Sequence, residues 1–335
     1  MNQTVFVFCG RSQFAAMRPV MRTHLLLTWL LWLQVCCRDV SSQTVCPRNE
    51  PRCVVNADST MIFQMRCSGY GTLAQLPPAC AEPRTISTLV VSRGTTTVDK
   101  LQHRILEGLR VRHLELAGLG IRSINLTAFE AVSSNLQDLQ LHDNRLETLP
   151  LGVFRTMRHL VRLQLHNNRL SHLGDGVFSG LTSLVYLTLN GNRLTASTVD
   201  PDTWFSLPKL VTLVLDDNNL GDGALRLPNG AFESLEELRL DRNRLGAVND
   251  DIISGLPNLR RLYLRSNEID SLPNNAFRSN ARLELVDLSA NNISQLTGTP
   301  FAGKSYSQLT KPTTELQGMS HVVRAEGVTV CSLPE

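Results

Sequence analysis

A repeated leucine frame is the feature that most constrains the fold of this chain. The segment from Leu160 to Leu170 reads L-V-R-L-Q-L-H-N-N-R-L and matches L-x-x-L-x-L-x-x-N-x-L at every fixed position. The frame recurs at intervals of 24 to 26 residues, with starts at Leu136, Leu160, Leu184, Leu210, Leu235, Leu259 and Leu283. Such a period predicts an array of similar units stacked in one direction, and chain length then measures the number of units.

The frame is typical of the strand segment of a leucine-rich repeat. Side chains alternate along a strand, so the frame leucines should point inward and the x residues should line an open face. The frame Asn falls where each strand turns away. Because its amide both donates and accepts, we expect it to satisfy backbone groups that leave the strand ladder.

The second half of each unit supplies another apolar residue. These residues predict an apolar spine near the outer side of the array, formed by Phe129, Phe154, Phe178, Phe205, Phe232, Phe277 and Phe301, with Ile253 in the same slot. Prolines and glycines crowd these halves, which favours loops and single helical turns. These second halves need more space between successive units than paired strands, which are about 4.8 Å apart, so the array should curve with its sheet on the inside. The sequence therefore predicts an α/β leucine-rich repeat solenoid, a curved horseshoe with a parallel β-sheet on its concave face.

The N-terminal end of the array departs from the frame. A weaker copy starts at Val111 and has Leu119 in the Asn slot, where no amide is available, so we expect this unit to be less regular. One period earlier, the apolar residues of 86–91 resemble a degenerate first repeat. We assign residues 85–305 to about 8 to 9 leucine-rich repeats.

Residues 1–42 are predicted to be a secretory signal peptide that is cleaved after Ser42. The apolar run from Leu25 to Val35 follows two arginines and is too short to span a bilayer comfortably. An uncleaved signal anchor is the alternative. No later segment is apolar enough to cross a membrane.

The eight cysteines avoid the repeats. Four of them, Cys46, Cys53, Cys67 and Cys80, fall within residues 43–84, which we assign to a cysteine-rich N-terminal cap over the first repeat. Clustered cysteines beside a signal-like segment indicate an oxidising compartment, and two disulfides with three possible connectivities are expected. A zinc site is disfavoured because the cluster has no C-x-x-C pair.

Charge and motifs narrow the function classes. The formal net charge of +3, with both signs interspersed, gives no argument for nucleic acid or for anionic membranes. One phosphate-loop spelling, G-T-P-F-A-G-K-S at 298–305, lacks the preceding strand and the following helix that such a loop requires. The sequence therefore predicts no enzymatic activity and no cofactor.

The pattern from Leu136 through Pro150 to Phe154, together with the C-P pair at Cys46, resembles extracellular leucine-rich repeat proteins of animals. That group includes Toll-like receptor ectodomains, Slit and the small leucine-rich proteoglycans. The resemblance implies a secreted or cell-surface module that binds an extracellular protein or glycoprotein through its concave sheet, in adhesion, matrix organisation or ligand sensing. The alternative is the recognition segment of a longer receptor or multidomain enzyme.

Members of this group often end in a second cysteine cap that opens with N-P-W-x-C-x-C, and no such motif follows Phe301. Residues 306–335 are therefore predicted to be an incomplete C-terminal cap remnant. In that case Cys331 has lost its partner. The alternative is an intermolecular disulfide through Cys331.

The open face is the predicted binding surface. Its central column reads Glu115, Gln140, Gln164, Thr188, Val214, Arg239, Tyr263 and Asp287. Tyr and Arg are frequent among residues that dominate protein interfaces. The candidate binding residues are Tyr186, Val214, Arg239, Arg261, Tyr263 and Arg265. The alternative is an ordinary charged surface on which Glu237 and Asp241 neutralise the arginines.

His142 and His166 hold equivalent open-face positions on adjacent repeats, so they should be neighbours. They could bind a metal or respond to mild acid. No third ligand is evident in the sequence, and two solvated side chains are the favoured interpretation. No metal site is predicted.

Beyond the predicted signal peptide, two N-glycosylation sequons are present, at Asn125 and Asn292. Asn125 is expected to be the better acceptor. Asn292 adjoins the frame residue Asn291, and we expect it to be partly shielded.

Overall fold

A computed structural model describes residues 53–57, 63–70, 85–93, 98–102, 106, 110–222, 225–248, 250–293, 321–325 and 328–332. The chain divides into two compact units, and all described residues belong to the unit formed by 43–79 and 83–335. The predicted signal peptide, Cys46, Cys80, Phe301 and the 298–305 segment lie outside the described residues.

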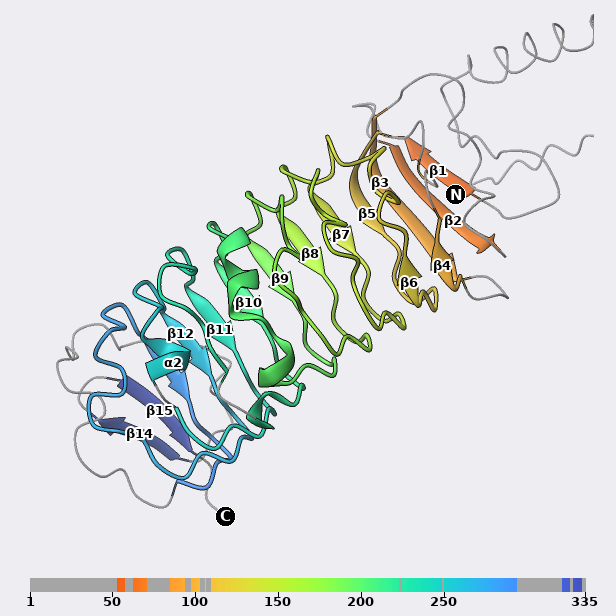
Figure 1. Cartoon of the computed structure of the whole chain (residues 1–335). Coiled ribbons are helices and arrows are strands. Elements are labelled where there is room, and N and C mark those ends of the chain that lie inside the picture. The colour runs from red at the N-terminus through yellow and green to blue at the C-terminus, as the bar shows by residue number, and fades with distance from the viewer. Residues whose placement is uncertain are drawn as a thin grey trace, which may run out of the picture. The chain divides into compact units, whose positions relative to one another are not determined.

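One long sheet organises the described unit (Figure 1). Its 13 strands follow in the order β1 (Cys53–Ala57), β2 (Phe63–Tyr70), β3 (Thr85–Arg93), β5 (Arg110–Glu115), β7 (Asp138–Gln140), β8 (Arg162–Gln164), β9 (Tyr186–Thr188), β10 (Thr212–Val214), β11 (Glu237–Arg239), β12 (Arg261–Tyr263), β13 (Leu285–Asp287), β15 (Val328–Ser332) and β14 (His321–Ala325). In the part of this order that runs from β2 to β15, each strand is parallel to the next. At the two ends, β1 pairs with β2 and β14 pairs with β15 in the antiparallel sense. A small parallel pair, β4 (Lys100–Leu101) and β6 (Ser123–Ile124), lies apart from this sheet.

The strand register confirms the leucine frame. Leu139 pairs with Leu163 and Leu163 with Leu187, and all three side chains are fully buried. The degenerate first repeat is also confirmed, since Ile86 pairs with Val111 in β5. Each repeat thus adds one rung, meaning one strand with its returning back, to a single continuous leucine core.

The frame asparagines form the expected hydrogen-bond ladder. The Asn168 side-chain oxygen accepts from the N–H of Leu146 at 3.0 Å, and its NH2 donates to the carbonyls of Leu141 and Leu165, both at 3.0 Å. Equivalent bonds recur at Asn144, Asn192, Asn218, Asn243, Asn267 and Asn291. Leu119, in the same slot of an earlier rung, offers a buried apolar side chain instead. Each amide therefore connects its own strand to the preceding rung.

The residue before the frame Asn adopts a left-handed backbone. The positive φ angles lie between 53° and 65°, at Asp143, Asn167, Gly191, Asp217, Arg242, Ser266 and Ala290. This conformation turns the chain away from the sheet at the same point of every rung. Asn and Asp tolerate it better than most residues do, which accounts for their frequency here.

The predicted apolar spine is present, but the assignment of Phe205 to it is wrong. Phe205 is 51% exposed, whereas Trp204 is fully buried. The Trp204 ring lies 6.3 Å from the Phe178 ring and 5.6 Å from the Phe232 ring, centroid to centroid. This repeat is 26 residues long, and its extra length forms the 3₁₀ helix η4 (Pro201–Ser206), which turns residue 204 inward. The remaining described spine residues are buried: Phe129, Phe154, Phe178, Phe232, Ile253 and Phe277.

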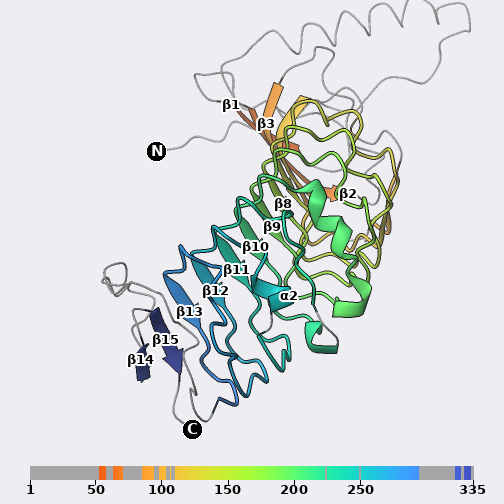
Figure 2. The same ribbon diagram turned by 60° about the vertical axis from the view of Figure 1, so that its left-hand side comes forward.

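The backs of the rungs are turns and short helices, as the glycines and prolines predict (Figure 2). The helices among the described residues are η3 (Ala196–Thr198), η4, η5 (Leu220–Asp222) and α2 (Asp250–Ile253). The described unit is therefore an α/β leucine-rich repeat solenoid with the parallel sheet on its inner, concave face. Among the described residues, we find no helix with the length and apolar character needed to cross a bilayer.

Candidate binding face

The strand register aligns the open-face residues into columns. Gln164 of β8 lies beside Thr188 of β9, followed by Val214 of β10, Arg239 of β11 and Tyr263 of β12. A second column runs through Tyr186, Thr212, Glu237 and Arg261. The predicted central column is thus confirmed as a row of adjacent side chains.

A hollow of about 410 Å³ opens over β9, β10 and β11. Tyr186, Val214 and Arg239, three of the predicted binding residues, line it. Val214 is only 8% exposed and Thr188 4%, so the floor of the hollow is closely covered by neighbouring side chains. Tyr186 and Arg239 are half-buried and form its polar and aromatic walls.

Arg239 is held from two sides. Its Nε donates to a carboxylate oxygen of Asp216 at 3.1 Å, and its guanidinium carbon lies 4.8 Å from the centre of the Tyr263 ring. The ion pair and the cation–π contact restrict the rotamers of a long side chain. Arg239 is thus preorganised on the open face, which reduces the entropy lost when a partner binds.

Two carboxylates near the arginines, those of Asp216 and Asp241, are buried. One oxygen of Asp216 accepts the N–H of Asp241 at 2.8 Å, and Asp241 in turn accepts the N–H of Arg265 at 2.8 Å. Burial raises the pKa of Asp216, and burial together with the Asp216 charge raises the pKa of Asp241 to about 6. The arginine that contacts Asp216 does not outweigh the burial. Through these two hydrogen bonds, the carboxyl groups link the C-terminal ends of three adjacent strands, β10, β11 and β12.

The alternative interpretation, in which Glu237 and Asp241 neutralise the arginines, matches the observed ion pairs only in part. Arg261 bonds Glu237, with Nη2 to Oε2 at 2.9 Å, as expected. Asp216, rather than Asp241, bonds Arg239. Arg265 is exposed, and its side chain has no ion pair within the part of the chain that the structure describes. The sequence alone did not assign this role to Asp216 because Arg239 is in register with Val214, and its contact with Asp216 therefore runs diagonally between two columns.

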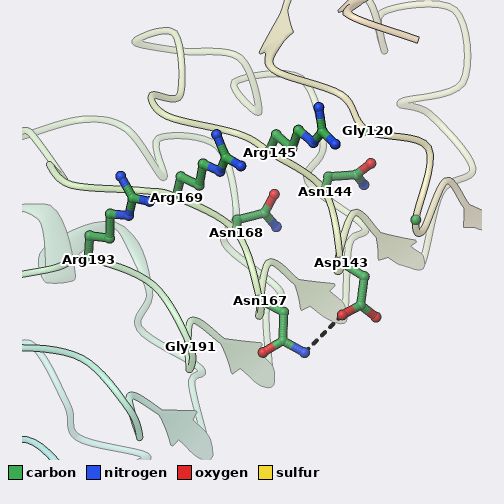
Figure 3. Close-up of a pocket in the computed structure, with 10 residues that line it drawn as sticks. Gly120, Asp143, Asn144, Arg145, Asn167, Asn168, Arg169, Gly191 and Arg193 are labelled. Atoms are coloured by element: carbon green, nitrogen blue, oxygen red, sulfur yellow. Dashed lines mark hydrogen bonds between the residues drawn. The ribbon is translucent and has the colours of Figure 1, made fainter. Parts of the chain in front are cut away.

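A second hollow, also about 410 Å³, lies at the edge of the sheet (Figure 3). Three arginines at the same frame position, Arg145, Arg169 and Arg193, extend side by side along it. Their backbone N–H groups each donate to the preceding rung at 2.8 Å, to Ile121, Leu146 and Leu170 respectively. The repeat thus sets three guanidinium groups in one row, here named the arginine row. None of the three forms an ion pair with another described residue.

The two histidines are neighbours, as predicted. The rings of His142 and His166 stack with centroids 4.4 Å apart and planes 8° apart. Asp143, which the sequence did not single out, lies beside them, with its carboxylate 2.7 Å from His142 Nδ1.

The two sequons differ from the expected order of accessibility. Asn292 is exposed, so the expected shielding was wrong, and its backbone N–H donates to the carbonyl of Ile269 at 2.9 Å. The Asn125 side chain is half-buried, and its oxygen accepts from the backbone N–H and the hydroxyl of Thr127 at 3.0 and 2.9 Å. Use of either site stays a prediction.

Cys53 and Cys67 are directly opposite one another in the antiparallel pair β1 and β2. Opposed residues in such a pair have Cα atoms about 4.5 to 5.5 Å apart, a separation that a disulfide can span. Cys331 lies in β15, in register with Asp287 of β13.

Comparison with known proteins agrees with this architecture. A family model described as "Leucine rich repeat" matches residues 134–194, 158–220 and 233–293. Fibromodulin of Oryctolagus cuniculus is 39% identical over 89 residues, which cover 26% of this chain and 57% of fibromodulin. Podocan of Mus musculus is 34% identical over 157 residues, covering 46% of this chain and 24% of podocan. The chain therefore spans little more than half of one relative and a quarter of the other.

Human Toll-like receptor 8 is 34% identical over 100 residues, covering 28% of this chain and 9% of the receptor. A solved complex of TLR13 with ssRNA13 superposes with a TM-score of 0.58 at 24% identity, covering 68% of this chain and 33% of that one. That likeness shows the fold alone. The chain thus contains leucine-rich repeats, and these are similar to stretches of fibromodulin, podocan and the Toll-like receptors.

Proposed function

We propose that this chain is a binding module that recognises a protein or glycoprotein partner through the concave sheet over β9 to β12. The observation that carries the proposal is the fixed position of Arg239 between Asp216 and Tyr263 at the wall of an open hollow. Arg and Tyr, with Trp, are enriched among the residues at the energetic centre of protein interfaces. The hollow has Tyr186 and Arg239 as its walls and the buried Val214 at its floor, and a side chain of a partner could insert between them.

The other predicted residues fit the rim of such an interface. Arg261 and Arg265 are exposed, and among the described residues only Arg261 forms an ion pair, with Glu237. Rim charges mainly steer association and set its salt dependence. We therefore assign Tyr186, Val214, Arg239 and Tyr263 to the centre of the proposed interface, and the two outer arginines to its rim.

A partner captured from the extracellular fraction and then measured by surface plasmon resonance tests the proposal. Tyr186→Ala and Tyr263→Ala should each weaken binding at least about tenfold, the level of a strong interface residue. Arg278→Ala is the matched control, because Arg278 is an exposed residue of a rung back and should leave the affinity unchanged. Equal affinity of both tyrosine variants and the wild type would exclude this face as the binding site.

The resemblance to extracellular repeat proteins supports secretion or display at the cell surface, with cleavage after Ser42 and glycosylation at Asn125 or Asn292. It also supports a binding role without catalysis. The recognition segment of a longer receptor or multidomain enzyme is the alternative. Peptide mapping of the secreted protein would locate the mature N-terminus and the occupied sequon together.

The arginine row favours a second candidate function, the binding of anionic glycan groups carried by a partner. Neighbouring strands are about 4.8 Å apart, so the three guanidinium groups, which form no ion pair with another described residue, repeat in one row along the hollow. Guanidinium binds oxyanions such as carboxylate and phosphate through paired hydrogen bonds. Chromatography on immobilised heparin should show Arg169→Ala eluting at lower salt than the wild type.

Arg226→Ala is the control for that experiment, since it removes the same net charge elsewhere on the array. Equal elution of both variants would mean that retention follows net charge alone. Retention of the wild type on single-stranded nucleic acid but not on heparin would instead identify the row as a nucleic-acid contact.

A further inference from the structure

The stacked histidines arise directly from the repeat. His142 and His166 follow β7 and β8 at the same frame position, and the register of Leu139 with Leu163 places them on adjacent rungs. Their rings are 4.4 Å apart and nearly parallel, at 8°. Two imidazoles are therefore held side by side at the boundary between the open face and the arginine row.

A third donor group reaches the same point. The left-handed backbone of Asp143, with φ of 56°, turns its carboxylate beside His142, with Oδ2 2.7 Å from Nδ1. One nitrogen from each ring and one carboxylate oxygen of Asp143 all lie within 4.8 Å of one another. Two imidazoles and a carboxylate are the donor set of many three-residue zinc sites, which leave a fourth position for water.

Neighbouring side chains orient these donors. The Asn167 amide donates to the other Asp143 oxygen at 2.9 Å, and the Thr188 hydroxyl lies 3.0 Å from Nδ1 of His166. Outer hydrogen bonds of this kind fix the orientation of ligating imidazoles and carboxylates in metal sites. The site is also accessible, because the Asp143 side chain is 51% exposed and the His142 side chain 20%.

We propose that His142, Asp143 and His166 bind a divalent transition-metal ion, with Zn²⁺ as the best match to two nitrogens and one oxygen. The ion takes the position between His142 Nδ1 and Asp143 Oδ2, and the neutral His142 ring then carries its single proton on Nε2. A nitrogen of His166 from the next rung and one water complete four-coordination. Ca²⁺ and Mg²⁺ are disfavoured because they require mainly oxygen ligands.

Binding requires a modest change of side chains only. Ligand atoms around tetrahedral Zn²⁺ are about 3.3 to 3.6 Å apart, given bonds of about 2.0 to 2.2 Å, so the donors must move closer. Ring nitrogens bind metal in the plane of the ring, and therefore the two parallel rings must tilt toward each other. Both histidines lie at strand ends facing solvent, where rotation about the side-chain bonds leaves the strand ladder unchanged.

The position of the site gives the ion a role beyond local stability. His166 also lines the hollow over β9 to β11, and Asp143 lines the hollow of the arginine row. A carboxylate of a partner could replace the water on the ion from either side. Metal binding itself does not depend on the proposed partner, and the two can fail separately.

Isothermal titration of the purified, untagged protein with ZnCl₂ in a non-chelating buffer tests the proposal. The wild type should bind one ion at this site, and Zn²⁺ should raise the melting temperature. His142→Ala and His166→Ala should each weaken Zn²⁺ binding at least tenfold. Asp143→Asn keeps the Asn167 contact and the backbone conformation, and it should weaken binding by a smaller factor. Circular dichroism of each apo variant would verify the fold.

His172→Ala is the matched control, because His172 is exposed and does not belong to the three-residue cluster. It should bind Zn²⁺ as the wild type does. Absorption of the Co²⁺ form should show the intense visible bands of a four-coordinate ion in the wild type and lose them in His142→Ala/His166→Ala. Unaltered Zn²⁺ binding by this double variant, or no binding by the wild type, would overturn the proposal.

Discussion

At the scale of single residues, Trp204 shows how the spine tolerates a longer repeat. Its ring fills the slot between Phe178 and Phe232, while its indole N–H is buried with no hydrogen-bond partner among the described residues. Trp204→Ala should therefore cost about 3 to 5 kcal/mol of unfolding free energy through the cavity that it leaves. Trp204→Phe should cost less than about 1.5 kcal/mol, because it also removes an unpaired donor. Urea unfolding measures both, with the exposed Phe205→Ala as control.

Asp241 makes a prediction about pH. Its pKa of about 6 in the folded chain exceeds the ordinary value of 3.8, so the folded state binds a proton more tightly than the unfolded state. Its contribution to stability is complete below about pH 4 and is lost as pH rises through 6. Asp241→Asn keeps an acceptor for the N–H of Arg265 and removes the charge. The variant should be more stable than the wild type at pH 7 and show a flatter stability profile between pH 4 and 6.

Thermal unfolding across that pH range measures the effect. Asp217→Asn is the control, because Asp217 is exposed and pairs with Arg242 through Nη2 at 2.7 Å. This control should keep the wild-type slope between pH 4 and 6. A wild-type slope in Asp241→Asn would show that another group titrates there.

At the scale of structural elements, the Asn ladder joins each strand to its neighbours. Asn168→Ala would leave the Leu146 N–H and the carbonyls of Leu141 and Leu165 without their side-chain partner in the core. Because each buried unsatisfied group costs about 1 to 3 kcal/mol, the variant should lose about 3 kcal/mol or more. Asn190→Ala, one rung along on the open face, should change stability by less than about 0.5 kcal/mol. Chemical denaturation of the two variants gives the comparison, and equal losses would contradict a special role for the ladder.

The β1–β2 pair carries a prediction about disulfide connectivity. Since Cys53 and Cys67 are opposed in this pair, we expect them to be linked, which leaves Cys46 to Cys80 as the other bond of the cap. Peptide mapping of the non-reduced secreted protein should recover a Cys53–Cys67 cross-link. A link from Cys53 to Cys46 or Cys80 would contradict the register. Closing a loop of this length should stabilise the chain by about 3 kcal/mol.

At the scale of the whole molecule, the period of the sequence was sufficient to predict the fold. Leucines such as Leu163 and the frame Asn repeat the same local environment, so one rung predicts the next. The site was less predictable, because its contacts join different rungs through residues that no frame requires. Asp216 and Asp143 occupy variable positions, and their contacts with Arg239 and His142 depend on side-chain rotamers and on a left-handed turn. The sequence did supply the columns, and hence the neighbours Tyr186, Thr212 and Val214.

The stacked arrangement also predicts which strands lose stability when one rung is destabilised by a substitution. Each rung contacts mainly the rungs on either side, although the buried residues form one continuous core. Leu187→Ala, in the central strand β9, should cost about 2 to 5 kcal/mol by opening a cavity. In a nearest-neighbour stack, amide hydrogen exchange should accelerate most in β8, β9 and β10 and least in β5 and β13. Val161→Ala, at an exposed position, is the control. Equal acceleration in all strands would mean that the array unfolds as a single cooperative unit, and the rungs would then be coupled far beyond their neighbours.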